Sequence, residues 1–267
     1  MIYSYTQVAN FLACPRRYRF RYLEGWQEKD TRAGLLFGRA FEKALAALFR
    51  REDPGAALFR EWSIYQEHKL EYSRRDSWRT IYDQAIKLLE LFVQQDRIEI
   101  RRPRRNLQVR VAKALSPTSQ FVGYIDAYGF LDGTRCVIDW KTTTARYPEE
   151  PEGLVTLDPQ LVAYSWLTGE PEVAFVVFVR KKMPEIQYLR TTISESQRRE
   201  FGELVRDTVA QIEAAQFLPH AGIRFPQNLC TSCSYLGLCL DNHELIDRRL
   251  TRSVRGEDFA WLDELAA

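Results

Sequence analysis

Residues 123–141 read GYIDAYGFLDGTRCVIDWK and hold the clearest structural pattern in the chain. Both halves of this stretch are rich in aromatic and β-branched residues, which favour β-strands. Between them stands Asp132-Gly133, a dipeptide suited to a two-residue type I′ turn because both central positions of that turn need positive φ. The stretch therefore predicts a β-hairpin in which Leu131 pairs with Thr134.

This register places two aspartates opposite each other. Counting back from the turn in step along both strands pairs Asp126 with Asp139, and Lys141 projects from the same face two residues further on. Like charges directly opposed across strands destabilise a sheet. We therefore expect a divalent cation at the pair, and oxygen ligands favour Mg²⁺ or Mn²⁺. The alternative is two solvated aspartates held by Lys141. The opposite face, which we expect in the core, carries Cys136, Ile138 and Trp140.

The rest of the chain predicts an α/β protein. Apolar spacing favours helices over residues 5–12 with Ser4 as N-cap, 35–50, 55–71 and 77–97. Residues 98–106, IEIRRPRRN, read as a basic loop, and three strands follow over 107–115, 121–131 and 134–141. After them we expect a helix capped by Asp158, strands over 174–181 and 186–193, and a helix that SESQ (194–197) opens as a capping box and that ends near Phe217.

The composition fits a folded protein without a membrane span. Hydrophobic residues make up 45% of the 267 residues, and the net charge of +2 excludes a histone-like polycation but not a local basic patch. The longest apolar run, VAFVVFV at 173–179, is much shorter than the about 20 residues of a membrane-spanning helix. The opening MIYSYTQ lacks the basic and apolar regions of a signal peptide. We expect a cytoplasmic protein, in which cysteines more often serve metal binding or catalysis than disulfides.

The five cysteines are unevenly spaced. Three stand together as Cys230-x2-Cys233-x5-Cys239, which suggests a metal site with one ligand missing. Cys136 falls on the core face of the hairpin, where a small buried hydrophobe fits. Cys14 has no such strand context. The residues alone leave it as either a buried hydrophobe or the missing ligand.

Two stretches are rich in basic residues. Residues 16–22, RRYRFRY, interleave Arg16, Arg17 and Arg19 with aromatic residues, which suits either phosphate contacts with base stacking or an amphipathic helix whose aromatics face the core. Residues 97–113 hold seven Lys or Arg against Glu99, and suit either a nucleic-acid path or a solvated loop. Any nucleic-acid contact here would be made to the backbone, with strong salt dependence.

Four motifs, in this order, resemble the PD-(D/E)XK nuclease superfamily and within it the RecB-like branch. SYTQVANFLACPRRYRFRYL at 4–23 resembles the opening of AddB-type and CRISPR-associated RecB-like nucleases. GRAFEKAL resembles the G-x-x-x-H helix of that branch, with Glu42 where histidine is usual. GYID followed by VIDWKT resembles the metal-binding hairpin. QLVAY resembles the Q-x-x-x-Y helix and places Gln160 and Tyr164 one turn apart.

The resemblance implies a restriction-endonuclease-like αβββαβ core and metal-dependent hydrolysis of phosphodiesters. Asp126 and Asp139 would bind Mg²⁺ or Mn²⁺ together with the backbone carbonyl of Trp140, and Lys141 would orient the attacking water and stabilise charge on the phosphate. Glu42 would be a further metal ligand, the alternative being a helix-surface glutamate. Gln160 and Tyr164 would contact phosphate, DNA or metal-bound water, the alternative being packing within a buried helix.

For the cysteines, the resemblance implies a 4Fe-4S cluster held by Cys14, Cys230, Cys233 and Cys239. Zinc is the competing metal, because four thiolates also form a closed tetrahedral zinc site. Either metal would have a structural role, tying the two ends of the chain together.

These features predict a single nuclease domain over residues 1–267. Residues 4–105 would be mainly helical, 106–217 the nuclease core, 218–240 with Cys14 the iron–sulfur segment, and 241–267 a tail. We expect a DNA exonuclease that acts on single strands or duplex ends. A helicase or another protein of DNA repair, recombination or CRISPR adaptation would be its partner. The alternatives are an inactive nucleic-acid-binding or scaffold domain of the same fold, and a zinc-stabilised interaction protein.

Overall fold

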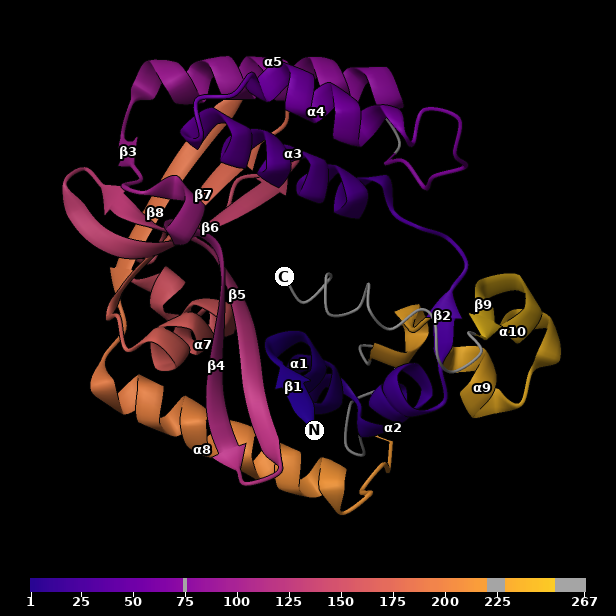
Figure 1. Ribbon diagram of the computed structural model, residues 1–267. Coiled ribbons are helices and arrows are strands. Elements are labelled where there is room, and N and C mark those ends of the chain that lie inside the picture. The colour runs from indigo at the N-terminus through magenta and orange to yellow at the C-terminus, as the bar shows by residue number, and fades with distance from the viewer. Residues whose placement is uncertain (74–75, 220–228, 253–267) are drawn as a thin grey trace. The chain divides into compact units, whose positions relative to one another are not determined.

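The computed structural model describes residues 1–73, 76–219 and 229–252 (Figure 1). These form two compact units. The central unit comprises Thr31–Val111 and Tyr124–Arg199, and the terminal unit comprises Met1–Asp30, Ala112–Gly123 and Glu200–Ala267. Parts of the predicted iron–sulfur segment and tail, residues 220–228 and 253–267, lie outside the described residues.

The central unit is built on a mixed β-sheet. Strands β5, β6, β7 and β8 are neighbours in that order, and β3 and β4 also pair with β5. The β6–β7 pair is parallel, whereas β5–β6 and β7–β8 are antiparallel. The strands are β3 (Ile98–Glu99), β4 (Leu107–Ser116), β5 (Ser119–Leu131), β6 (Thr134–Thr143), β7 (Glu172–Val179) and β8 (Glu185–Thr192). The meander and the parallel crossover to β7 match the predicted αβββαβ order, and β8 corresponds to the further strand predicted over 186–193.

The turn between β5 and β6 confirms the predicted hairpin. Asp132 has a φ of 49° and Gly133 a φ of 78°, as a turn with two positive φ values requires. Regular pairing then runs from Leu131–Thr134 back to Ala127–Ile138. The predicted register is therefore correct over these five pairs.

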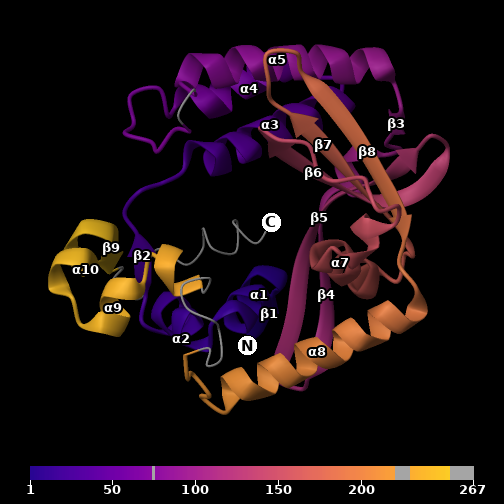
Figure 2. The same ribbon diagram turned by 180° about the vertical axis from the view of Figure 1, so that it is seen from behind.

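Helices cover both faces of this sheet (Figures 1 and 2). On one face, Cys136, Ile138 and Trp140 belong to the main apolar core, as predicted, together with residues of α3 and α5 such as Phe41 and Phe92. The opposite face carries Lys141 and Phe175, and α7 lies over it. The helices of this unit are α3 (Ala33–Phe49), α4 (Pro54–Ser63), α5 (Trp78–Gln95), α6 (Pro103–Asn106) and α7 (Pro159–Thr168), with a 3₁₀ turn at Leu154–Leu157.

Capping side chains set where several helices begin. Asp158 Oδ1 accepts hydrogen bonds from the backbone N–H groups of Gln160 and Leu161 at the start of α7. At the start of α8 (Glu195–Glu213), Ser194 and Gln197 bond each other's backbone N–H groups at 3.0 and 3.2 Å, which confirms the predicted capping box.

Three sequence predictions need correction. The helix expected over 55–71 ends at Ser63, and α8 ends at Glu213 rather than near Phe217. The basic loop expected over 98–106 contains β3 and α6. Ile98 pairs with Leu131 of β5 and is buried, so this short strand is set by a partner more than thirty residues away rather than by local pattern.

The terminal unit gathers segments from both ends of the chain. Strand β1 (Ile2–Ser4) pairs in parallel with residues 120–122 of β5, and Ser4 caps the following helix as predicted. Strand β2 (Trp26–Glu28) pairs antiparallel with β9 (Leu250–Arg252). The helices confined to this unit are α1 (Tyr5–Ala13), α2 (Pro15–Tyr18), α9 (Leu236–Leu240) and α10 (His243–Arg249), with a π-helical turn at Arg19–Leu23 and a 3₁₀ turn at Leu229–Ser232.

Among the described residues, no helix combines the length and apolar character needed to cross a membrane.

Candidate active site

The two aspartates of the hairpin are buried at the point where regular β5–β6 pairing stops. Asp126 is 9% exposed and Asp139 is 1% exposed. Beyond the Ala127–Ile138 pair, the backbone N–H of Trp140 donates a 2.8 Å hydrogen bond to Asp126 Oδ2. A side-chain carboxylate of β5 thus takes the place of a backbone acceptor, which fixes Asp126 against β6.

Lys141 is held beside Asp139. Its Nζ lies 2.5 Å from Asp139 Oδ2 as an ion pair, and it donates a 2.8 Å hydrogen bond to Gln160 Oε1. The same ammonium stands 5.3 Å from the centre of the Phe175 ring. The lysine is therefore clamped between an aspartate of its own strand and a residue of α7.

Gln160 and Tyr164 complete this clamp from α7. Gln160 Nε2 donates to the Tyr164 hydroxyl at 2.9 Å, so the two side chains are joined one helical turn apart, as their spacing predicts. The Tyr164 hydroxyl in turn hydrogen-bonds Asp139. Burial, followed by the charges of Asp139 and Asp126, raises the pKa of Tyr164 well above its ordinary value, so this residue stays a phenol.

Glu42 of α3 also faces this site. Its negative charge is one of the causes that raise the pKa of Asp126, which places the two carboxylates within electrostatic reach. One turn earlier, Gly38 lies against β6, where an added Cβ would stand 3.5 Å from Thr142 Oγ1. Glu42 Oε1 accepts a 2.7 Å hydrogen bond from Gln108 Nε2. Sequence reasoning missed Gln108, because no motif includes it.

The charges of the site are unbalanced. Burial raises the pKa of Asp126 well above its usual range, and the neighbouring charges of Asp139 and Glu42 raise it further. Burial also raises the pKa of Asp139, although Lys141 opposes this effect. Burial alone would lower the pKa of Lys141, but Asp139 and Asp126 raise it. Three carboxylates thus face one ammonium.

Such an oxygen-rich, negatively charged site has the donor set that Mg²⁺ and Mn²⁺ prefer. Within residues 1–73, 76–219 and 229–252, no three His, Cys, Asp or Glu side chains are already arranged to hold one metal ion. At this site, Lys141 and Gln108 engage Asp139 and Glu42 instead. The donor set fits a hard divalent cation, and binding would require these side chains to readjust.

The raised pKa of Asp126 predicts a pH dependence of metal-free stability. The pKa of Asp126 in the folded protein lies above its unfolded value of about 4. The contribution of protonated Asp126 to the free energy of unfolding is therefore fully present below the unfolded pKa, and it is lost as pH rises through the folded-state pKa. Each pH unit inside this window removes up to about 1.4 kcal/mol. Urea unfolding of chelator-treated protein across this range should show the loss, and Asp126→Asn should flatten it. Parallel pH profiles for the two proteins would contradict the assignment.

In the terminal unit, Cys14, Cys230, Cys233 and Cys239 lie within electrostatic reach of at least one other member of this group, but among the described residues no three of their thiols are arranged to hold one metal ion. Burial raises the pKa of the Cys233 thiol, and the Cys239 and Cys14 thiols raise it further. Burial also raises the pKa of the Cys239 thiol, and the Cys14 and Cys230 thiols raise it further. Cys14 thus lies near Cys233 and Cys239, which are more than two hundred positions away in the chain. Their four thiols are a donor set that fits an iron–sulfur cluster or zinc.

Cys136 is separate from this group. It is fully buried in the central unit, and burial raises the pKa of its thiol to about 11. Its surroundings in the apolar core, with Ile138 and Trp140, are those of a packing residue. The prediction of Cys136 as a buried hydrophobe is confirmed.

The predicted nucleic-acid-binding arginines of the opening motif have partners within the terminal unit. Arg16 donates a hydrogen bond to Cys239, and Arg17 acts electrostatically on Cys233; each of these interactions lowers the pKa of the thiol. Arg19 Nε forms a 2.7 Å ion pair with Glu24. The aromatic residues between them face inward, as Tyr18 packs against Phe11 and Phe217.

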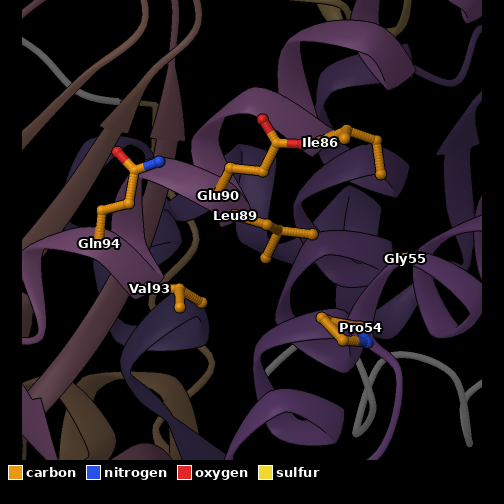
Figure 3. Close-up of a pocket in the computed structure, with 7 residues that line it drawn as sticks. All are labelled: Pro54, Gly55, Ile86, Leu89, Glu90, Val93 and Gln94. Carbon is orange, nitrogen blue, oxygen red and sulfur yellow. The ribbon is translucent and has the colours of Figure 1, made fainter.

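An apolar groove lies elsewhere on the central unit (Figure 3). It has a volume of about 350 Å³ and is formed where the start of α4 meets α5. Its lining residues are Pro54, Gly55, Ile86, Leu89, Glu90, Val93 and Gln94. None of the predicted site residues lines it.

Comparison with known proteins identifies the family. A sequence model of the PD-(D/E)XK nuclease superfamily matches residues 2–240, so the chain belongs to this superfamily. Among solved structures, a crystal structure of a "Putative exonuclease" from Eubacterium rectale is 11% identical, with a TM-score of 0.54 over 86% of each chain. At this identity the likeness shows the fold alone.

Another structural neighbour is more distant. The crystal structure of SSO0001 is 15% identical and covers 90% of this chain and 86% of its own, but its TM-score of 0.38 is too low to support an argument. The comparison with curated proteins gave no match.

Proposed function

We propose that this chain is a metal-dependent DNA nuclease of the RecB-like branch, and specifically an exonuclease acting on single strands or duplex ends. One observation carries the proposal: two buried aspartates meet at the end of a hairpin ladder, with a lysine fixed beside one of them. Membership of the nuclease superfamily supports hydrolysis of a nucleic acid. The RecB-like motifs of the sequence support the finer assignment.

In this proposal Asp126, Asp139, Glu42 and the backbone carbonyl of Trp140 hold Mg²⁺ or Mn²⁺. When bound, the ion would activate a water molecule and neutralise charge on the scissile phosphate. Lys141 contributes a fixed ammonium that orients the attacking water and stabilises the negative charge that develops on the phosphate. Its contacts with Asp139 and Gln160 hold this cation in place before reaction, which is the condition for strong electrostatic stabilisation.

Gln160 and Tyr164 have two proposed tasks. Their hydrogen bonds position Lys141 and Asp139. We also propose that they contact phosphate, DNA or metal-bound water, because Gln160 bonds Lys141 and Tyr164 bonds Asp139.

Exposed arginines of the central unit supply a phosphate-binding surface. In residues 97–113, Arg97 is paired with Asp132 and Arg101 with Glu99. Four others are exposed and form no ion pair with any described residue: Arg102, Arg104, Arg105 and Arg110. They flank Gln108, which contacts the site through Glu42. We propose that these four bind the DNA backbone. The predicted DNA contacts of Arg16, Arg17 and Arg19, which belong to the terminal unit, are a separate proposal.

We further propose that Cys14, Cys230, Cys233 and Cys239 hold a 4Fe-4S cluster. The electrostatic effects of these thiols on one another and the RecB-like spacing support it. Its role would be structural, because four thiolates leave no open coordination position. A place in DNA repair, recombination or CRISPR adaptation, with a helicase or similar partner, rests on the resemblance alone.

The experiment is an assay on end-labelled DNA with anaerobically purified full-length protein and Mn²⁺. We expect release of short products from linear single strands or duplex ends, abolished by a chelator, and no cleavage of closed circles. Cleavage of closed circles would contradict the exonuclease assignment. Binding to DNA without any cleavage would favour an inactive scaffold of the same fold.

The role of Glu42 can be tested separately. Glu42→Ala is expected to raise the Mn²⁺ concentration needed for half-maximal cleavage by about 10-fold or more, because one carboxylate ligand is lost. Glu42→His should restore part of the activity, since imidazole also binds Mn²⁺. The measurement is a Mn²⁺ titration of the cleavage rate. An unchanged titration in Glu42→Ala would make Glu42 an ordinary helix-surface residue.

A further inference from the structure

Gln108 has an unusual backbone conformation for its place in the fold. It is the second residue of β4 and has a φ of 52°. Non-glycine residues rarely adopt this left-handed conformation. Seven of the described non-glycine residues do so, and the other six lie at helix ends or in turns: Arg51, Asp96, Arg102, Asp132, Ala215 and Asp241. Among the described residues, Gln108 alone has this conformation inside a strand.

The conformation has a consequence for the side chain. Successive residues of a regular strand point to opposite faces, and Leu107 is buried in the core that α3 helps to form. Gln108 nevertheless reaches α3, where its Nε2 donates to Glu42 Oε1 at 2.7 Å. A left-handed residue breaks the alternation of a strand and re-aims the side chain, as bulges beside active sites do. Strain of this kind persists where the surroundings enforce it, and it gathers at functional sites.

A second contact fixes the orientation of the amide. Lys43 Nζ donates to Gln108 Oε1 at 3.2 Å. An ammonium can only donate and a carboxylate can only accept, so the amide oxygen must face Lys43 and the amide nitrogen must face Glu42. Gln108 thus stands between a cation and an anion that are adjacent in sequence.

This arrangement suits a metal ligand better than a direct ion pair would. A lysine bonded to Glu42 would compete with a metal for the carboxylate. A neutral amide donor orients the carboxylate without neutralising its negative charge, which can still attract a metal ion. The bond engages Oε1, and no described residue forms a hydrogen bond with Oε2. Glu42 can therefore keep its hydrogen bond and offer its second oxygen.

We propose that Gln108 is a positioning residue that aims Glu42 at the metal held by Asp126 and Asp139. The inference rests on the proposed function, since it gives Glu42 a metal to bind. Hydrogen-bond partners of metal ligands typically change metal affinity by about 10- to 100-fold when they are removed. Gln108 would be such a partner.

The test separates positioning from a structural role by using residues that tolerate positive φ. Gln108→Gly and Gln108→Asn both suit the left-handed backbone, so the melting temperature of metal-free protein should equal or exceed that of wild type. Neither side chain can reach Glu42 as glutamine does. Isothermal titration with Mn²⁺ alone, without DNA, should show about 10-fold weaker binding in both. Arg51→Gly, at a φ of 62° after α3, is the matched control and should keep wild-type affinity.

A double substitution tests whether Gln108 affects Mn²⁺ binding through Glu42. In a Glu42→Ala background, Gln108→Asn should not weaken Mn²⁺ binding further, because the group it positions is gone. Additive losses, or wild-type Mn²⁺ affinity in Gln108→Asn, would overturn the inference. Asp139→Asn serves as the reference. If it abolishes Mn²⁺ binding and Gln108→Asn does not weaken it, only the inference is wrong. If Asp139→Asn binds Mn²⁺ as wild type does, the proposed site itself is wrong and the inference falls with it.

Discussion

Replacing Asp139 by asparagine is expected to slow DNA cleavage at least about 10³-fold, which corresponds to about 4 kcal/mol of lost transition-state stabilisation. Asparagine keeps the shape of the side chain but gives up the charge that would hold the metal. Asp126→Asn should lose cleavage for the same reason, and Lys141→Ala should lose it because the fixed cation is gone. The measurement is the initial rate of product release from end-labelled DNA with saturating Mn²⁺.

The two asparagine variants should differ in stability without metal. Asp139 is 1% exposed and pairs with Lys141, so Asp139→Asn leaves a largely buried ammonium without its anion and should cost up to about 3 kcal/mol. Asp126 instead accepts from the Trp140 N–H, which an asparagine oxygen can still do. Asp126→Asn therefore removes a buried charge and its repulsion by Asp139, and it should leave stability unchanged at low pH and raise it by up to about 1.4 kcal/mol for each pH unit above the unfolded pKa. Asp126→Ala, which leaves that N–H unsatisfied, should cost about 1–3 kcal/mol.

Urea unfolding of all four variants, with and without Mn²⁺, completes this test. Mn²⁺ should stabilise wild type because a ligand that binds only the folded state raises its stability, and this gain should vanish in both asparagine variants. If Asp126→Asn, Asp139→Asn and Lys141→Ala all degrade DNA at the wild-type rate, the nuclease site is not here. Equal effects of the two asparagine variants on metal-free stability would contradict the contacts assigned to them.

Replacing Cys14 by serine is expected to remove essentially all iron from anaerobically purified protein and to bleach its brown colour. A cluster that needs four thiolates loses a ligand that lies more than two hundred residues from the other three. Cys233→Ser should have the same effect. The measurements are iron and zinc content by elemental analysis and the visible absorption spectrum. Stoichiometric zinc without iron would end the cluster proposal, and unchanged colour in Cys14→Ser would end the assignment of that residue.

Cys136→Ala is the matched control for these substitutions. Cys136 is buried in the core of the central unit, and burial raises the pKa of its thiol to about 11. The variant should keep its iron and colour and lose only the packing of one small side chain, about 1 kcal/mol. Loss of iron in Cys136→Ala would show that iron content reports folding rather than ligation.

The hairpin could be predicted from sequence because its information is local. Asp132-Gly133 sets the turn, and the turn sets the register as far as the Ala127–Ile138 pair, just beyond which both aspartates lie. The helix caps at Ser4, Asp158 and Ser194 were predictable for the same reason. Strands β1, β2, β3 and β9 were not, because each has two or three residues and shows no periodicity of its own. Their positions depend on partners that lie far away in the chain.

In the candidate site, too, the residues with a local sequence signal could be predicted and those placed by distant contacts could not. Asp126, Asp139 and Lys141 follow from one hairpin, whereas Gln108 reaches Glu42 through a left-handed backbone that glutamine does not favour, so its sequence gives no signal. The opening arginines show the same limit. Their alternation with aromatics suited either nucleic-acid contacts or an amphipathic helix, and neither reading could show that two of them act on cysteines far away in the chain.

The β2–β9 ribbon bears on how the protein is made. Trp26 pairs with Arg252, so the β2–β9 ribbon cannot form until residues 27–252 have been synthesised. At about 5–20 residues per second, that delay is on the order of ten to fifty seconds. For most of this interval Cys14 has been synthesised and Cys230, Cys233 and Cys239 have not, so its thiol is open to oxidants and to other cysteines. Growth conditions that keep thiols reduced should therefore raise the yield of this protein.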